Sequence, residues 1–234
     1  MSVSRRFIFE DPLTSAKNKG QSHNICCLSV VESLEAEVIL KFLLGLSGLK
    51  RVPRSGWLSH GVSLPDVESV ADHTFSTCAL SMMLADLEEN RGVRHDMEKV
   101  LRMALLHDLA ESLTFDISRA YLQYMGMRGR AIKREVEKSA WNHIAKGVTD
   151  PKLARKYRSL QSEYDAGITK ESKIVHAADS LDILLQILEY RRRGYPKDLL
   201  SDIWNEQLKT VTRLNLQSAR TLLKLIVNEE VRLR

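Results

Sequence analysis

The sequence is poor in residues that break helices. Of its 234 residues, 11 are glycine and 5 are proline, so long helices are easier to build than a sandwich of short strands and turns. It also lacks an uninterrupted apolar run of about 18 residues, the length at which a helix can cross a bilayer. Two arginines near the start are followed by polar and acidic residues, which does not match a secretory signal peptide. We therefore expect a helical protein without a membrane segment.

Cysteine is equally scarce. Cys26 and Cys27 are neighbours on the chain, a placement that rarely allows an unstrained disulfide, and Cys78 is the third cysteine. No C-x-x-C pair is present, so a thiolate zinc site is not expected. An odd number of cysteines without regular spacing is typical of a reducing compartment, and we expect a cytoplasmic protein.

No strong excess of one charge is present. Lysine and arginine total 35 and aspartate and glutamate 30, a net charge of +5. So small an excess acts mainly on solubility and on the steering of ligands. We expect no nucleic-acid partner, although a small phosphate-bearing molecule is compatible with this charge.

Apolar residues recur at helical steps of three and four along most of the chain, and glycine or proline lies near the ends of the periodic segments. The pattern predicts helices at about 31–46, 67–90, 96–113, 129–146, 151–165, 171–193, 197–204 and 207–230, with a loop at 49–66 and irregular chain at 114–128. No segment alternates as a strand does. The expected fold is all-α, with a polar N-terminal extension (residues 1–30) before one helical domain (residues 31–234).

Four polar residues interrupt these apolar helices. His73 lies in the second expected helix, His107 and Asp108 lie in the run MALLHDLAESL, and Asp179 lies in IVHAADSLDILL. A lone buried histidine is more often a hydrogen-bonded core residue than a ligand. Buried ionised carboxylates, however, need a partner, and imidazoles and carboxylates from several helices are a common ligand set inside helical bundles. Together the four residues predict a metal site.

These motifs resemble the HD superfamily of metal-dependent phosphohydrolases. The resemblance lies in the order His…His-Asp…Asp within SVADHTF, ALLHDLAE and ADSLD, and it covers about residues 42–206. The segments LKRVPRSGW and HDLAESLTFDI look most like the 5′-deoxynucleotidase branch, which includes bacterial YfbR-type enzymes and eukaryotic HD-domain-containing proteins. The resemblance implies an HD-type helical bundle that hydrolyses deoxynucleoside 5′-monophosphates to nucleoside and phosphate.

The resemblance also implies that His73, His107, Asp108 and Asp179 bind one divalent metal ion. Two imidazoles and two carboxylates suit cobalt, manganese, iron or zinc better than calcium, and magnesium is less favoured. Such an ion polarises a phosphoryl group and lowers the pKa of a bound water.

Two further acids are candidate catalytic residues. Glu111 follows His107 by four residues and Asp108 by three, which on a helix places it on the side of the metal ligands. It resembles the acid of the family that shuttles protons for the water or the leaving group. Asp116 matches the second carboxylate of the family, which helps to position the water or the sugar. Taken alone, Asp116 is equally consistent with an ordinary turn aspartate.

Arg54 and Trp57, in the loop at 49–66, are the candidate substrate-binding residues. In the 5′-deoxynucleotidase branch an arginine in this loop contacts the phosphate, and a tryptophan closes against the sugar and excludes a 2′-hydroxyl. Ser55-Gly56 separates the two here, as in eukaryotic relatives, whereas they are adjacent in the bacterial enzymes. Trp57 is equally consistent with a buried loop anchor, and Arg51 is a second candidate for the phosphate.

Two other functions stay open at this point. The same catalytic residues could act on a cyclic nucleotide, a dNTP or an alarmone, although no additional basic cluster lies near the motifs to hold several phosphates. A non-catalytic nucleotide-binding module with a structural metal is the other alternative, but such a site needs no unligated acid like Glu111. Relatives are usually dimers, so we expect a homodimer with a small-molecule nucleotide as substrate. The apolar C-terminal residues Leu214, Leu222, Leu225 and Ile226 fit either an interface or the core.

Overall fold

The computed structural model describes residues 36–40, 42–148 and 150–233. The description below concerns the unit formed by Val38–Arg234. Within the described ranges the chain forms helices and one isolated bridge, between Pro53 and Ser69, and contains no strand. The all-α prediction is therefore confirmed, while the predicted extension at 1–30 lies outside the described residues.

The helices follow one another along the chain with short connections. Residues 36–40 and 42–48 are helical. The later elements are the 3₁₀ turns η1 (Leu49–Arg51), η2 (Leu64–Asp66) and η3 (Asp198–Leu200) and the helices α2 (Ser55–Ser59), α3 (Val70–Glu89), α4 (Met97–Leu106), α5 (Glu111–Thr114), α6 (Arg119–Tyr124), α7 (Gly126–Lys146), α8 (Pro151–Ala166), α9 (Lys170–Arg192), α10 (Ser201–Leu214) and α11 (Gln217–Arg232). None of these helices combines the length and the apolar character that crossing a bilayer requires.

Side-chain caps fix where the two longest core helices begin. Ser69 and Asp72 form a reciprocal capping box at the start of α3, and the Thr169 hydroxyl accepts a hydrogen bond from the third residue of α9. Such caps satisfy backbone N–H groups that have no partner inside the helix. They therefore set the position along each helix of His73 on α3 and of Asp179 on α9.

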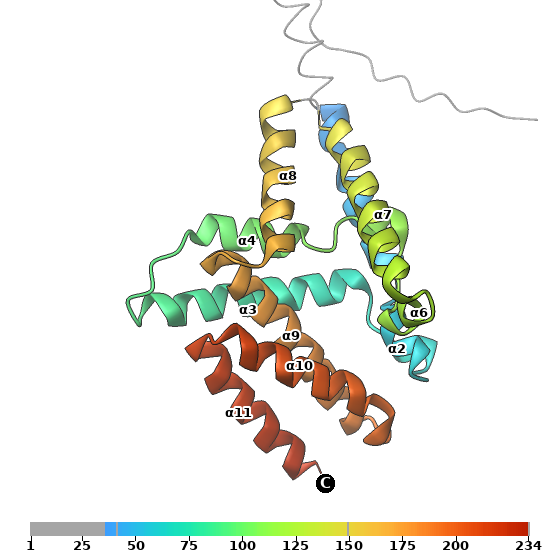
Figure 1. Cartoon of the computed structure of the whole chain (residues 1–234), viewed down its shortest axis with the longest axis vertical. Coiled ribbons are helices and arrows are strands. Elements are labelled where there is room, and N and C mark those ends of the chain that lie inside the picture. The colour runs from blue at the N-terminus through green and yellow to red at the C-terminus, as the bar shows by residue number, and fades with distance from the viewer. Residues whose placement is uncertain (1–35, 41, 149, 234) are drawn as a thin grey trace, which may run out of the picture. The chain divides into compact units, whose positions relative to one another are not determined.

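Helix α9 is the centre of the main hydrophobic core. It packs against α3, α4, α8, α10 and α11, and Figure 1 shows it running between α3 and the α10–α11 pair. Its Leu181, Leu184 and Ile187 are fully buried, and each such side chain contributes about 1.5–3 kcal/mol relative to an exposed one. The polar residues carried by α3 and α9 are thus held in tightly packed surroundings.

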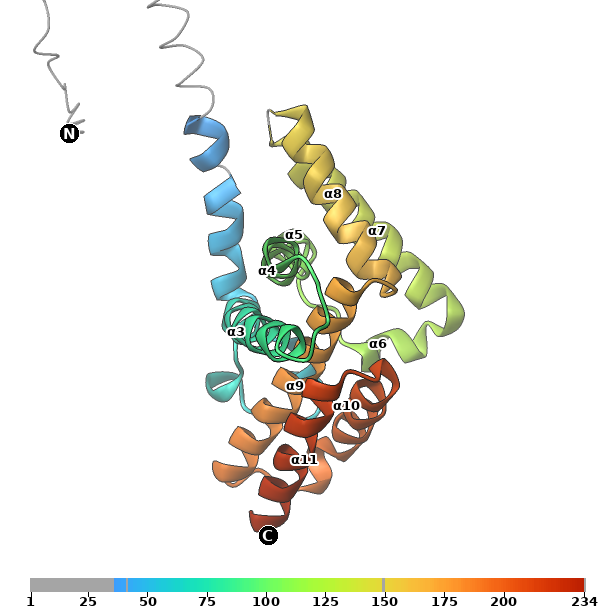
Figure 2. The same ribbon diagram turned by 90° about the vertical axis from the view of Figure 1, so that its left-hand side faces the viewer.

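A second hydrophobic cluster joins α7 and α8 to the loop before α3. Trp141 of α7 and Leu160 of α8 pack in it with Leu109 and with Leu49 of η1. Figure 2 shows α7 and α8 side by side, and the two helices contact each other. Helix α7 is therefore supported mainly by packing outside the main core.

The helix expected at 96–113 is two helices in the structure. Helix α4 ends at Leu106, residues 107–110 form tight turns, and α5 begins at Glu111. The turns close by bonds between residues three apart, such as the Glu111 N–H to the Asp108 carbonyl at 3.0 Å. Because such turns keep side chains near helical spacing, apolar periodicity alone does not detect the break.

Two other expectations on helix boundaries were wrong. The region 114–128, expected to be irregular, contains α6 and the start of α7. The segment expected as one helix at 207–230 is divided between α10 and α11, because Asn215 adopts a left-handed conformation with φ 56°. Asparagine tolerates this conformation at a helix end better than most residues do.

Candidate active site

Two buried histidines meet between α3 and the turn after α4. Their Nε2 atoms lie 3.4 Å apart, while His73 Nδ1 lies 2.7 Å from Asp182 Oδ2 and His107 Nδ1 lies 2.7 Å from the Ala104 carbonyl oxygen. A carboxylate and a carbonyl only accept hydrogen bonds, so each Nδ1 is the donor and the Nε2 of each neutral ring carries a lone pair. Two lone pairs at this separation repel each other unless a cation lies beside them.

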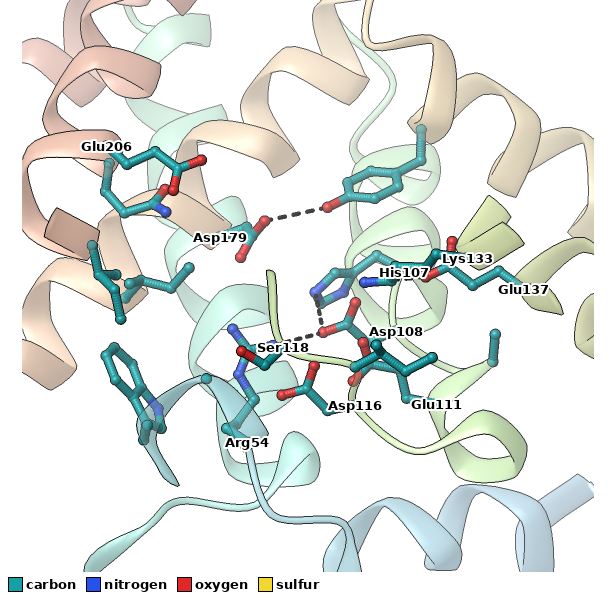
Figure 3. A pocket seen from close by; sticks show the side chains of 18 of the residues that line it. Arg54, His107, Asp108, Glu111, Asp116, Ser118, Lys133, Glu137, Asp179 and Glu206 are labelled. Carbon is teal, nitrogen blue, oxygen red and sulfur yellow. Dashed lines mark hydrogen bonds and ion pairs between the residues drawn. The ribbon is translucent and has the colours of Figure 1, made fainter. Parts of the chain in front are cut away.

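Two carboxylates approach the same Nε2 atoms. Asp108 Oδ2 lies 3.2 Å from His107 Nε2 and 3.6 Å from His73 Nε2, and Asp179 Oδ1 lies 3.3 Å from His73 Nε2. Figure 3 shows Asp108, from the turn between α4 and α5, and Asp179, from α9, reaching into one cavity. The ligand atoms of His73, His107 and Asp108 all lie within 4.8 Å of one another, so this group could hold a metal ion. Two imidazole nitrogens together with carboxylate oxygens suit a divalent transition metal.

The charges around these residues favour a cation in the same place. Burial and the neighbouring Arg54 favour neutral His73, but hydrogen bonds and charge from Asp179 and Asp182 outweigh them and raise its pKa to about 10. Burial alone would raise the pKa of Asp108 and of Asp179, yet the histidines hold both pKa values well below the usual range for aspartate. The donor set therefore fits a bound metal ion, which would replace the proton that His73 otherwise attracts.

Arg54 is fixed beside this group by the backbone of its loop. Its N–H donates to the Glu68 carbonyl at 3.0 Å, and the Val70 N–H donates to the Val52 carbonyl at 2.8 Å, so the loop is bound to the start of α3. Arg54 Nη1 then reaches Asp108 Oδ2 at 3.1 Å. The structure thus brings Arg54 to the cavity that His107, Asp108 and Asp179 line.

Arg51, the second candidate for the phosphate, is exposed and does not line the cavity. Its last-turn position in η1 leaves its side chain in solvent. Of the two arginines considered from the sequence, Arg54 is the one placed to meet a ligand there.

Trp57 both lines the cavity and anchors the loop. Its side chain is 3% exposed, its Nε1 donates to Glu68 Oε1 at 2.9 Å, and its ring meets Tyr190 edge to face at 5.3 Å. The two interpretations made from the sequence are therefore compatible with each other. One face of the indole belongs to the core, and another part of the residue borders the cavity.

Glu111 is buried in the cavity wall as the first residue of α5. Burial is the largest cause that raises the pKa of its carboxyl group well above the ordinary value, and repulsion from Asp108 and Asp116 adds to it. Its Oε2 atom has no hydrogen-bond partner among the described residues. A buried acid with a free oxygen and a raised pKa is suited to carry a proton.

Asp116 is aimed by a strained turn. Phe115, just before it, has φ 58° and ψ 165°, a region that is essentially restricted to glycine and costs a side-chain-bearing residue about 1–3 kcal/mol. The bond from the Phe115 N–H to the Glu111 carbonyl at 3.0 Å and the bond from the Ser55 N–H to Asp116 Oδ2 at 2.6 Å hold the turn in place. Asp116 thereby connects the α5 turn to the Arg54 loop and lines the same cavity.

Sequence reasoning missed four side chains that support the site. Asp182 fixes the His73 ring, and its position three residues after Asp179 in ADSLD was an available signal. The Tyr164 hydroxyl donates to Asp179 Oδ2 at 3.4 Å. Lys133 and Glu137 line the cavity from α7, and no sequence signal distinguished them from the other charged residues of that helix.

The cavity has a volume of about 330 Å³ and receives side chains from α2, α7, α8, α9 and α10 as well as from the α4–α5 turn. Ligand pockets typically measure about 300–1,000 Å³, so this one is sized for a small molecule. Figure 3 shows Arg54, His107, Glu111 and Asp116 near Asp108, with Glu206 farther away, beyond Asp179.

Solved structures share this fold. The PH0347 protein of Pyrococcus horikoshii OT3 is 33% identical, with a TM-score of 0.66 over 83% of this chain and 99% of that one. An HD-domain phosphohydrolase from Listeria innocua is 23% identical, with a TM-score of 0.69 over 82% of this chain and 88% of that one. The helical arrangement described above is thus found in known proteins.

Curated relatives are similar in sequence over most of their length. The 5′-deoxynucleotidase HDDC2 of Danio rerio is 33% identical over 152 residues, which are 65% of this chain and 69% of the relative. The 5′-deoxynucleotidase hdd1 of Schizosaccharomyces pombe is 33% identical over 174 residues, 73% of this chain and 81% of the relative. The family model of the HD domain matches residues 46–221, a range that includes His73, His107, Asp108 and Asp179 as well as the loop that carries Arg54. The chain belongs to the HD domain family.

Proposed function

We propose that this protein is a metal-dependent phosphomonoesterase that hydrolyses deoxynucleoside 5′-monophosphates to nucleoside and phosphate. The observation that carries the proposal is the convergence of two imidazoles and two carboxylates at one cavity: His107, Asp108 and Asp179 line it beside Arg54 and the acid Glu111, and the fully buried His73 contacts all three. The names of the relatives, which are 5′-deoxynucleotidases at about one third identity, support the choice of substrate.

His73, His107, Asp108 and Asp179 are the proposed metal ligands. The ion would polarise a phosphoryl oxygen and lower the pKa of a water bound to it. Manganese, cobalt, iron and zinc suit two nitrogen and two oxygen donors, and magnesium, which prefers an all-oxygen shell, suits them less. Asp182 and the Ala104 carbonyl hold the imidazole rings in the orientation that this binding needs.

Glu111 is the proposed proton carrier. As water attacks phosphorus and the bond from phosphorus to the 5′-oxygen breaks, ionised Glu111 accepts the proton of the water and returns it to the departing 5′-oxygen. Its raised pKa allows both steps near neutral pH. Asp116 orients the water or the sugar, and the Arg54 guanidinium offsets the negative charge that develops on the phosphoryl oxygens.

Trp57 is the proposed contact of the sugar. It borders the cavity while its ring is fixed by Glu68 and Tyr190. A fixed aromatic wall leaves no room or partner for an added hydroxyl group, which favours a 2′-deoxyribose over a ribose.

Other nucleotides fit the cavity less well. A volume of about 330 Å³ is at the lower end of the range for ligand pockets of about 300–1,000 Å³, which favours a monophosphate over a dNTP or an alarmone. The buried Glu111 argues against a non-catalytic module. Burying a carboxyl group without a partner lowers the stability of the fold, and a module that only binds does not need such a group.

We also propose that the protein is a cytoplasmic homodimer. Of the two interpretations left open for the apolar C-terminal residues, the core is favoured over an interface, because Ile226 packs in the main core and Leu214 and Leu222 pack against it. Helix α3 instead exposes Phe75, Met82, Met83 and Leu87 on one face, and an apolar face of this kind is typical of a protein contact. Light scattering after size exclusion should give a dimer for the wild type and a monomer for a Phe75→Glu/Met83→Glu variant.

A screen of metals and substrates tests the proposed activity. The protein is stripped of metal, reloaded with manganese, cobalt or magnesium, and assayed for phosphate release from ribo- and deoxyribonucleoside 5′-monophosphates and from triphosphates. We expect release from deoxynucleoside monophosphates, faster with manganese or cobalt than with magnesium. Absence of release from every monophosphate, with any metal, would refute the proposal.

A further inference from the structure

One face of helix α7 forms a wall of the cavity. None of the sequence motifs that resemble the family lies on this helix. Lys133, Glu137 and Trp141 follow one another at intervals of four residues, and all three line the cavity. Residues four apart lie on the same face of a helix. Figure 3 shows Lys133 and Glu137 extending toward Asp108 from the side opposite Arg54.

The charges that line the cavity are unbalanced. Among the described lining residues, eight carry a carboxyl group but two, Arg54 and Lys133, carry a permanent positive charge. Arg54 is already paired with Asp108 at 3.1 Å. A phosphate monoester is a dianion near neutral pH, so its binding among so many carboxylates requires every available cation.

Lys133 has hydrogen-bonding capacity to spare. An ammonium group has three donors, and the ion pair described for Lys133 is with Glu137 Oε1 at 3.3 Å. Burial favours the neutral amine, but Glu137, Glu111 and Asp116 outweigh burial and raise the pKa of Lys133. The group therefore stays charged at any working pH and lies within the field of both candidate catalytic acids.

A second donor on the same helix face has no partner. Trp141 is 5% exposed, and its Nε1 is buried with no hydrogen-bond partner among the described residues. A buried donor without an acceptor destabilises the folded protein, and an acceptor-rich ligand in the cavity would remove that penalty. The α7 face thus presents two N–H donors on either side of Glu137.

We propose that Lys133 binds the phosphate of the substrate from the wall opposite Arg54, so that the phosphate lies between two cations carried by different parts of the chain. This inference rests on the proposed function for the identity of the substrate, but phosphate binding at Lys133 can be measured without turnover.

Calorimetric titration of the metal-loaded protein with inorganic phosphate tests the proposal. Lys133→Met should raise the Kd for phosphate about tenfold or more, since a charge-assisted hydrogen bond is lost, and Lys133→Arg should keep it within about threefold of the wild type. The matched control is Lys138→Met, which removes the same charge from an exposed position on α7. This control should leave the Kd within about twofold.

Kinetics on a deoxynucleoside monophosphate give the second measurement. Loss of a phosphate contact should raise KM for Lys133→Met by about the same factor as the Kd for phosphate, together with any loss in kcat. A Kd for phosphate that is unchanged in Lys133→Met, or no phosphate binding by the wild type, would overturn the proposal. A lowered melting temperature with an unchanged Kd would do the same and would assign Lys133 a structural role.

The two proposals fail separately. A wild-type protein that binds phosphate through Lys133 but hydrolyses no nucleotide would refute the proposed activity and retain this inference. A protein that hydrolyses deoxynucleotides equally well with methionine at position 133 would do the reverse.

Discussion

The cluster of proposed metal ligands and the wall formed by α5 and α7 lie at the same cavity but are built in opposite ways. His73 and Asp179 lie on long helices that cross in the main core, and the other nitrogen of each histidine is tied to an acceptor. Glu111 and Asp116 lie instead in a four-residue helix and a strained turn, facing a helix that packs in the second hydrophobic cluster.

The two regions also differ in how they treat carboxylates. Histidines hold the pKa values of Asp108 and Asp179 well below the ordinary range, while burial and neighbouring acids hold the pKa of Glu111 well above it. When their surroundings shift the pKa values of neighbouring acids in opposite directions, the acids with lowered pKa values keep a fixed charge, and those with raised pKa values can exchange protons. This contrast supports the proposal that the cluster binds the metal ion, while the wall transfers protons and holds the substrate.

The largest effect is expected where the cluster is broken. Asp179→Asn removes a charged ligand but keeps the shape of the side chain, so the protein should lose most of its bound metal and its turnover should fall about 10³-fold or more, the contribution of a metal ion to transition-state charge. Metal content is measured by mass spectrometry after dialysis, beside kcat/KM. Asp165→Asn, at the α8 side of the same cavity, is the control and should keep its metal.

Retention of full metal content and activity by Asp179→Asn would show that the cluster ends at Asp108. The site would then have three protein ligands, the group that lies within 4.8 Å. The comparison between the two regions would survive this result, but the role of α9 in metal binding would not.

A smaller effect with a different signature is expected in the wall. Glu111→Gln should lower kcat about 10²- to 10³-fold, within the range for general acid–base catalysis, while metal content stays at the wild-type level. In the wild type, kcat/KM should fall as the pH drops through the raised pKa of Glu111, because only the ionised form accepts a proton. The variant should lose this acid limb.

Glu135→Gln, an exposed position on α7, is the matched control and should keep both the rate and the acid limb. If Glu111→Gln kept the limb as well, another group would be the proton carrier. Asp116 is the nearest alternative on the same wall.

The two regions also differ in how well their residues can be predicted from the sequence. Polar residues in apolar helices are conspicuous, so the fold class and the convergence of His73, His107, Asp108 and Asp179 could be predicted from pattern alone. Glu111 was placed near the ligands on the premise of a continuous helix. The helix ends at Leu106, and the tight turns that follow bring Glu111 into the cavity by another route.

The position of Lys133 in the wall and the turn that orients Asp116 could not be predicted in the same way. Lys133 and Lys138 are both lysines in a highly charged amphipathic helix, and only the packing of α7 against the rest of the chain makes one line the cavity and leaves the other in solvent. The conformation of Phe115, which aims Asp116, is one that residues with a side chain rarely adopt. Sequence propensities argue against such a turn, because its support comes from the distant Ser55.

Trp57 belongs to neither region, because it borders the cavity from α2 while it packs in the main core. The smallest predicted effect concerns this residue. Trp57→Ala would remove a side chain that is 3% exposed, at a cost of about 3–5 kcal/mol in stability, and would confuse folding with specificity. Trp57→Phe keeps an aromatic ring but loses the indole width and the bond to Glu68. The ratio of kcat/KM for deoxy- over ribonucleoside monophosphates should fall about three- to tenfold, less than the hundredfold that a pocket can reach against an added hydroxyl.

Trp204→Phe is the control. Trp204 lies in the core beside Arg191 and does not line the cavity, so the same change in volume there should leave the ratio as it is. If both variants kept the wild-type ratio, Trp57 would be an anchor of the Arg54 loop alone, and exclusion of the 2′-hydroxyl would have to come from the Asp116 side of the cavity.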